Sequence, residues 1–336
     1  MITLVRKILR DLRVPLLVVC LILCAFQCFW VKITQRVVTD VSPFFASITS
    51  ALQKVPAALV SKDGDLSKII ENRLFKGPGR IMQTLAGGDN MRFEKAMDML
   101  SIGYVHPLMQ TLFCIWAIGR AAGAIAGELD KGTMELLMAQ PISRRTVILS
   151  HLIVDLITIP VLCLALWSGT FIGEKLIGPF HVDQADFADL PSFLRNEVKV
   201  DPEVLRIEPL AFWPGVINIG ALIFAVCGYT MWISSQGRFR WRVMGIAVLV
   251  TLLQFILNMA GQLWDVLAPF RPFSVFYYFQ PQRMILRHGT HVDFSVWNGG
   301  HPLIEVPANG VLFGVGLVGY LLALWSFKRR DLPAPL

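Results

Sequence analysis

The amino-acid sequence predicts an all-α, polytopic membrane protein with six transmembrane helices, and three observations support this fold class. Hydrophobic residues make up 54% of the 336-residue chain, only 16% of the residues are charged, and the mean hydropathy is +0.57. A soluble protein of this length carries about 25% charged residues, so the excess apolar surface needs a non-aqueous solvent. In addition, six apolar segments each approach the ~20 residues that cross a bilayer core, and basic residues cluster at their ends.

The first transmembrane helix is predicted over 14–31, after a basic N-terminal segment. In residues 1–13 the apolar residues fall on one helical face and the basic residues on the other, which predicts an interfacial helix leading into the membrane. A charged flank that only orients the span would show the same pattern. The span ends in Phe29-Trp30-Val31 without a small-residue cleavage site, so we interpret it as a retained anchor rather than a signal peptide.

Five further spans complete the predicted topology. Their bounds are 104–126, 146–172, 210–235, 243–264 and 306–327, and the last three contain no charged residue. Short basic segments at the N-terminus, at 127–145, at 236–242 and in the tail 328–336 all fall on one side, which the positive-inside rule assigns to the cytoplasm. We therefore expect a multi-pass protein of the cell membrane, plasma or inner, with both termini cytoplasmic. The net charge of +7 arises in these flanks and does not indicate nucleic-acid binding.

Three segments are predicted on the extracytoplasmic side: 32–103, 173–209 and 265–305. The first has the pattern of broken helices, which predicts a helical insertion between the first two spans, and no motif assigns it a ligand. The third contains an aromatic run, 273–279, that is typical of the interfacial belt of membrane proteins. Three histidines follow this run: His288, His291 and His301. They could bind a metal, but no carboxylate or cysteine completes a persuasive set.

The segment 127–145 is a charged island between the second and third spans, and it contains the pattern of a short helix. Gly132 breaks the preceding helix, Thr133 can cap a new one through its hydroxyl, and Pro141 stops it. Glu135 falls in the first turn, where the helix dipole favours negative charge. The apolar residues of this helix share one face: Met134, Leu137 and Met138. The pattern predicts an amphipathic helix that docks on another protein or on lipid headgroups.

The same loop carries a resemblance to a known family. The pattern Glu128-x-x-x-Gly132-Thr133-x-Glu135-Leu136-Leu137-x-x-x-Pro141-Ile142-Ser143-Arg144 resembles the cytoplasmic loop of ABC-2 type transporter permeases, and the Phe327-Lys328-Arg329-Arg330-Asp331 tail is similar to the tail of that family. In the family this loop supplies the coupling helix, which sits in a groove of a separate ATP-binding subunit. The resemblance implies that Glu128 and Glu135 make polar contacts with that subunit, while the apolar face fills the groove.

The function that the resemblance implies is that of a permease subunit in an ATP-driven exporter. Such a subunit works as half of a dimeric pore, with a second permease copy in a homodimer or a heterodimer and with the lipid bilayer as its solvent. The chain contains no P-loop, no His-Glu-x-x-His pair and no Gly-x-Ser-x-Gly nucleophile motif. We therefore expect no enzyme activity and no cofactor on this chain, with ATP and Mg bound by the partner subunit.

Polar residues inside the predicted spans form two further candidate sites. Arg120 and Asp155 lie about 10 Å and about 13 Å from the cytoplasmic ends of their spans by helical rise. Because an unpaired charge in the membrane is costly, these matching depths predict an ion pair, with His151 one turn from Asp155. Alternatively, Arg120 extends to the cytoplasmic headgroups. Gln254 and Asn258 form a polar stripe in the fifth span, which indicates either helix packing or a translocation path.

The first span carries a stripe of cysteines at four-residue spacing: Cys20, Cys24 and Cys28. Three aligned thiols could bind Cu(I), but cysteine used as a small packing residue gives the same pattern. The stripe and the external histidines together raise an alternative function, that of a membrane redox or copper-handling protein. A second alternative is a non-transporting membrane scaffold whose loop recruits a cytoplasmic partner.

Overall fold

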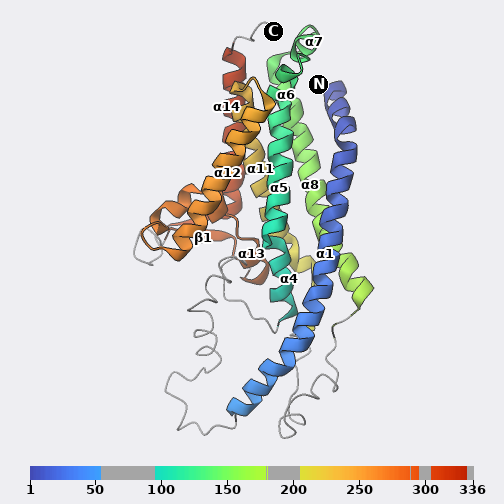
Figure 1. Ribbon diagram of the computed structural model, residues 1–336, viewed down its shortest axis with the longest axis vertical. Helices are drawn as coiled ribbons and strands as arrows, with labels where there is room; N and C mark the ends of the chain where they lie inside the picture. The colour runs from blue at the N-terminus through green and yellow to red at the C-terminus, as the bar shows by residue number, and fades with distance from the viewer. Residues whose placement is uncertain (54–94, 179, 181–204, 288, 295–303, 331–336) are drawn as a thin grey trace.

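The computed structural model describes residues 1–53, 95–178, 180, 205–287, 289–294 and 304–330, and it shows a bundle of long helices along the longest axis of the molecule (Figure 1). Within this described part, six helical segments are long and apolar enough to cross a membrane: Ile2–Thr39, Ala96–Ala124, Arg144–Ile177, Pro209–Gln236, Arg240–Leu263 and Ala308–Arg329. Each of them overlaps one predicted span. The all-α fold class with six transmembrane helices is therefore confirmed.

The first helix is longer than the sequence analysis predicts. α1 runs without a break over Ile2–Gln53, so the structure does not separate an interfacial helix at 1–13 from a span at 14–31. The basic side chains before the apolar part lie exposed on the same helix, and a change from a polar to an apolar surface requires no break in the backbone hydrogen bonds. Residues 32–53, assigned to the insertion, also belong to α1. Residues 54–94 of the predicted insertion lie outside the described residues.

The second predicted span, 104–126, consists of two helices. α4 covers Ala96–Val105 and α5 covers Pro107–Ala124. Proline disfavours helical backbone at the residue before it, so His106 takes φ −58° and ψ 133° and interrupts the helix. The ring Nδ1 of His106 accepts a hydrogen bond from the backbone N–H of Leu108 at 3.2 Å, which caps the start of α5.

The other transmembrane helices agree with the predicted spans to within a few residues. They are α8 (Arg144–Ile177), α11 (Trp213–Gln236, after the 3-10 turn η2, Pro209–Phe212), α12 (Arg240–Leu263) and α14 (Ala308–Arg329). α8 begins where the Ser143 hydroxyl accepts from the backbone N–H of Thr146 at 3.2 Å, and it continues through Pro160. α11 is the central helix: 72% of its most apolar stretch is buried, compared with 17% for α1 and for α12.

The segment after α12 is structured, and its aromatic run is not an interfacial belt as predicted. It forms the 3-10 turns η3 (Ala268–Phe273) and η4 (Val275–Tyr277) and the helix α13 (Pro281–Arg287). The antiparallel strands β1 (His291–Asp293) and β2 (Glu305–Pro307) follow, with Val292 opposite Val306. Residues 275–279 are only 4% to 8% exposed. Aromatic composition is shared by belts and buried cores. Here Asn218 of α11 donates to the carbonyl of Tyr278, and Gln254 of α12 accepts from the N–H of Val275, which places the segment in the core.

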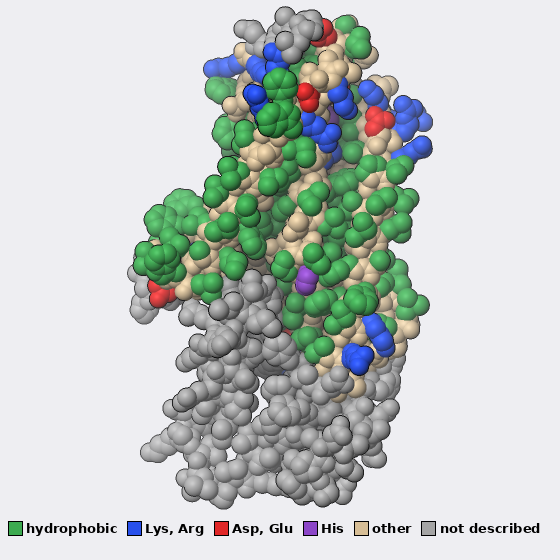
Figure 2. Space-filling view, viewed as in Figure 1, with side chains coloured by type: hydrophobic (Ala, Val, Ile, Leu, Met, Phe, Trp, Pro, Cys, Tyr) green, Lys and Arg blue, Asp and Glu red, His purple; other side chains and the backbone are tan. Residues whose placement is uncertain are grey.

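One end of the bundle carries both described chain ends and a cluster of basic side chains. The N-terminus, the last described turn of α14 and the short helices α6 (Ala126–Asp130) and α7 (Met134–Met138) lie at the same end (Figure 1). Lys and Arg side chains gather at this end, above a broad band of hydrophobic side chains (Figure 2). The α6–α7 loop thus lies on the same side of the hydrophobic band as the N-terminus and the last described turn of α14 (Figures 1 and 2).

α11 and α14 approach each other closely through glycine. A Cβ atom added to Gly228 would meet the backbone carbonyl oxygen of Gly316 and would lie 2.6 Å from its Cα. A Cβ atom added to Gly319 would likewise meet the backbone of Gly228. Small residues allow two membrane helices to pack backbone against backbone. This crossing leaves the neighbouring residue Tyr320 buried in the interior of the bundle.

Candidate functional site

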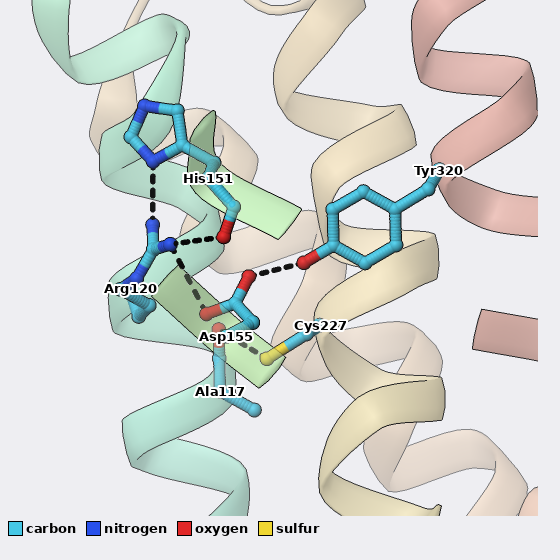
Figure 3. Close-up of polar contacts among 6 residues, drawn as sticks. All are labelled: Ala117, Arg120, His151, Asp155, Cys227 and Tyr320. Atoms are coloured by element: carbon cyan, nitrogen blue, oxygen red, sulfur yellow. Dashed lines mark hydrogen bonds and ion pairs between the residues drawn. The ribbon is translucent and has the colours of Figure 1, made fainter. Parts of the chain in front are cut away.

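A buried polar network lies inside the bundle and involves side chains of α5, α8, α11 and α14 (Figure 3). Arg120 of α5 forms an ion pair with Asp155 of α8, with 3.1 Å between Nη2 and Oδ1. Nη2 also donates to the backbone carbonyl of His151 at 2.8 Å, and Nη1 lies 2.7 Å from the ring Nδ1 of His151. The structure thus brings together the three residues that the sequence analysis grouped. Arg120 is paired in the interior rather than extended to the headgroups.

The network is removed from solvent and its charges balance. Asp155 is 0% exposed, and Arg120 and His151 are each 8% exposed. Because a guanidinium can only donate hydrogen bonds, the Nδ1 of His151 is the acceptor, and the imidazole is neutral with its proton on Nε2. The cluster therefore holds one cation and one anion. Either charge alone would cost about 3 kcal/mol at the centre of a membrane helix, so the pair depends on both partners.

Tyr320 and Cys227 belong to this network, and the sequence analysis did not identify them. The Tyr320 hydroxyl donates to Oδ2 of Asp155, and the Cys227 thiol donates to the backbone carbonyl of Ala117 at 3.9 Å. Tyr320 lies in a span without charged residues, where no charge marks a partner. The available signal is the hydroxyl itself, since a buried tyrosine usually finds a hydrogen-bond partner. That rule indicates a contact without saying which residue makes it.

The predicted short helix in the 127–145 loop is present, but Thr133 does not cap it as expected. α7 follows Gly132, whose φ of +69° is the left-handed conformation that glycine adopts without strain. The Thr133 hydroxyl turns back and donates to the carbonyl of Glu128 at 3.2 Å and to its carboxylate at 2.5 Å. This contact joins α6 to α7. The Glu128 side chain, expected to contact a partner, is therefore engaged within the chain.

The apolar face of α7 points into this chain, which corrects the expectation that it fills a groove on a partner. Met134 is 1% exposed, and Leu137 and Met138 are half-buried against the core of the bundle. The hydrophobic residue that α7 exposes is instead Leu136, at 71%. We call the exposed residues of α7 and of the turn directly after it the α7 ridge: Glu135, Leu136, Ala139, Gln140 and Pro141.

Arg144, which the resemblance places in the coupling motif, is also used within the chain. From the first turn of α8, its Nη1 donates to the backbone carbonyls that end α14, those of Phe327, Lys328 and Arg330, at 3.2, 3.4 and 2.5 Å. A basic side chain at a helix C-terminus satisfies carbonyls that have no partner inside the helix. Arg144 therefore ties the start of α8, directly after the α7 ridge, to the end of α14.

Two further arginines bind helix backbones at the same end of the bundle. Arg330 donates from Nη1 to the carbonyls of Ser235 and Gly237, at 3.0 and 2.9 Å, where α11 ends. Arg240, in the first turn of α12, donates to the carbonyl of Gly119 of α5 at 3.3 Å. The sequence analysis treated the basic flanks only as orienting charges. The structure shows that some of them also connect the ends of neighbouring helices.

Gln254 and Asn258, the polar stripe of α12, bind the segment that follows this helix. Gln254 accepts through Oε1 from the backbone N–H of Val275 at 3.0 Å, and Asn258 donates to the carbonyl of Phe276 at 3.3 Å. Both amides therefore hold η4 against α12. Of the two interpretations of this stripe, the contacts favour packing.

The cysteine stripe of α1 packs against α8. The Cys28 thiol donates to the carbonyl of Gly169 at 3.1 Å, and a Cβ atom added to Gly169 would lie 2.6 Å from the carbonyl oxygen of Cys24. In the part of the chain that the structure describes, no group of three or more His, Cys, Asp or Glu side chains could hold a metal ion. His288 and His301 lie outside that part. The contacts of the stripe favour the packing interpretation.

A family model described as ABC-2 family transporter protein matches residues 5–332, nearly the whole chain. No curated protein and no solved structure matches the chain. The family match agrees with the six transmembrane helices and with the resemblance of the 127–145 loop. The chain therefore belongs to the ABC-2 family of transporter proteins and is a multi-pass transmembrane subunit of an ABC transporter.

Proposed function

We propose that this chain is the permease subunit of an ATP-driven exporter and that a separate ATP-binding subunit docks on the α7 ridge. The observation that carries this proposal is the 71% exposure of Leu136, on a short helix beyond the hydrophobic band of the bundle (Figures 1 and 2). In helix-in-groove recognition, a short helix uses its exposed apolar side chains as anchors, and polar residues surround them at the rim of the contact. Glu135 and Gln140 supply that polar rim.

The proposal assigns the end of the bundle with α7 to the cytoplasm and the chain to the cell membrane. The gathering of Lys and Arg at this end supports the assignment, because positively charged flanks stay on the cytoplasmic side. ATP and Mg would be bound by the docked subunit. A second permease copy, identical or related, would complete the pore.

The contacts of α8 support a route by which docking drives transport. Arg144 joins the start of α8 to the end of α14, and Asp155 joins α8 to α5 through Arg120 and to α14 through Tyr320. If ATP binding moves the α7 ridge, α8 carries α5 and α14 with it in a rigid-body or shear movement. The proposed route thus includes the second, third and sixth transmembrane helices.

The test replaces the exposed leucine of the ridge with a charged residue. Leu136→Asp leaves the folded chain unstrained, because the side chain is exposed, but it puts a carboxylate into the proposed contact. We expect the variant to lose co-purification of a co-expressed ATP-binding subunit, together with coupled ATPase activity in nanodiscs. Ile304→Asp, at an aliphatic side chain that is 59% exposed and lies outside the transmembrane helices, is the control and should behave as wild type. Wild-type co-purification and coupling in the Leu136→Asp variant would contradict the proposal.

A further inference from the structure

Arg271 lies in η3, after the end of α12, and forms no ion pair with another described residue. The Arg271 stem packs against Gly261, its Nε donates to Oδ1 of Asn258 at 3.3 Å, and its guanidinium carbon lies 5.2 Å from the centre of the Tyr277 ring. These contacts fix the position of the guanidinium. The ion pairs among the described residues are Arg120–Asp155 and Arg206–Glu208, so Arg271 has no carboxylate partner within that part of the chain.

The guanidinium of Arg271 keeps donors available for a ligand. Its Nε is used by Asn258, whereas Nη1 and Nη2 have no hydrogen-bond partner among the described residues. Burial lowers the pKa of Arg271, because apolar surroundings disfavour a charge without a counter-ion. An anion that offers two oxygens would satisfy both nitrogens in the fork geometry that arginine forms with carboxylates and phosphates.

Exposed apolar side chains close to Arg271 in the sequence indicate what the rest of the ligand is made of. They are 42% to 72% exposed, and we call them the apolar shelf: Leu263, Trp264, Val266, Phe270 and Phe273. Hydrophobic side chains gather where the molecule projects at the end of α12 (Figure 2). A free phosphate ion would leave these side chains uncovered. A ligand that combines a phosphate with long apolar chains would cover them.

The apolar shelf continues the outward-facing surface of α12. Four residues at helical spacing along α12 are 50% to 57% exposed: Ile246, Leu249, Leu253 and Ile256. Leu263 extends the same face, about 10 Å beyond Ile256 by helical rise. An acyl chain that lies along this face would therefore lead to η3. Trp264, which is 60% exposed, is a residue type that is enriched at the membrane–water interface, where phosphate groups lie.

We propose that Arg271 binds the phosphate of a membrane phospholipid whose acyl chains cover the exposed face of α12 and the apolar shelf. Nη1 and Nη2 donate to two phosphate oxygens, while Asn258 and Tyr277 hold the guanidinium in place. Asn258 also holds η4 through the carbonyl of Phe276, so the bound lipid stabilises the packing of η3 and η4 on α12. The site requires only that the chain is in a membrane, and it is independent of the ATP-binding subunit.

The test uses the full chain and two photoreactive lipids with the same diazirine-labelled acyl chain. One is phosphatidylglycerol, and the other is a diacylglycerol that lacks the phosphate. After irradiation in detergent micelles, mass spectrometry quantifies cross-links to the segment 263–273. We expect phosphatidylglycerol to cross-link this segment at least about tenfold more than diacylglycerol, as charge-assisted hydrogen bonds predict. Equal cross-linking by the two lipids, or none by either, would overturn the proposal.

Variants assign the effect to Arg271. Arg271→Gln should reduce phosphatidylglycerol cross-linking to the diacylglycerol level, and Arg271→Lys should keep part of it. Arg287→Gln, at an exposed arginine of α13, should match wild type. Competition by inorganic phosphate alone would instead identify a free anion as the ligand. A change of oligomeric state in Arg271→Gln with unchanged lipid cross-linking would instead identify a second copy of the chain. Either result would contradict the proposal that the ligand is a phospholipid.

Discussion

Asp155 of α8 and Tyr320 of α14 are hydrogen bonded although 165 residues separate them in the sequence. The same carboxylate pairs with Arg120 of α5, so one buried anion connects three transmembrane helices. The start of α8 lies next to the α7 ridge, and Arg144 binds the end of α14 from there. α8 and α14 are therefore joined at two levels, at the charged end of the bundle and in its interior.

Removing the anion should destabilise the bundle. Asp155→Asn keeps the shape of the side chain but leaves Arg120 charged, buried and unpaired. We expect a loss of about 3–5 kcal/mol in the free energy of unfolding, measured in nanodiscs. Asp130→Asn makes the same change of charge at an exposed position and should be neutral within about 0.5 kcal/mol.

Replacing both charges should be less harmful than replacing one. The double variant carries both Arg120→Met and Asp155→Leu. It leaves no uncompensated charge, and its apolar side chains are compatible with the membrane interior. The double variant should therefore recover most of the stability that Asp155→Leu alone loses. Additive losses in the two single variants and the double variant would show that the residues do not depend on each other.

Tyr320→Phe should weaken the link between α8 and α14 without disturbing the ion pair. It removes one hydrogen bond to a carboxylate, for which we expect a loss of about 1.5–3 kcal/mol in wild-type background. The same replacement in an Asp155→Leu background should cost much less, because the acceptor is gone. A double-mutant cycle measured by thermal unfolding gives the coupling energy directly.

Gly228→Ala should separate α11 from α14. The added methyl group meets the backbone of Gly316, which cannot rotate away as a side chain can. Overpacking of this kind costs about 1–3 kcal/mol. Gly314→Ala is the matched control, since nothing lies within 4 Å of a Cβ atom at that position, and it should not lower the melting temperature.

Arg144→Ala should loosen the end of α14. The carbonyls of Phe327, Lys328 and Arg330 would lose their donor, so the last turn should exchange its backbone hydrogens about tenfold faster. Hydrogen–deuterium exchange measured by mass spectrometry reports this change. Arg145→Ala, at the exposed neighbouring residue, should leave exchange in α14 unchanged. Equal exchange in both variants would mean that Arg144 does not hold α14.

Much of the fold could be predicted because the membrane sets the length of the apolar segments. The ion pair could also be predicted, since Arg120 and Asp155 are rare charges in apolar spans at similar depth. Tyr320 could not, because its partner lies on a helix that the sequence does not place beside it. Periodicity in a single helix shows which residues share a face, but it contains no information about the neighbour that covers the face.

The same limit explains the corrections at α7 and in the segment after α12. Met134, Leu137 and Met138 share a face as predicted, but this chain itself covers it and leaves Leu136 outside. The aromatic run 273–279 has the composition of both a belt and a core. The burial of residues 275–279 and their backbone hydrogen bonds with Asn218, Gln254 and Asn258 distinguish the two, and these bonds connect residues that the sequence does not pair.

The most direct test of the central claim is a cross-link from the α7 ridge to an ATP-binding subunit. A thiol-to-amine cross-linker is applied to inside-out membrane vesicles that contain Leu136→Cys or, as the matched position in η2, Leu210→Cys. The account predicts a product between this chain and the ATP-binding subunit from position 136 and none from position 210. A product from position 210 alone, or labelling of position 136 by an impermeant thiol reagent added to intact cells, would contradict it.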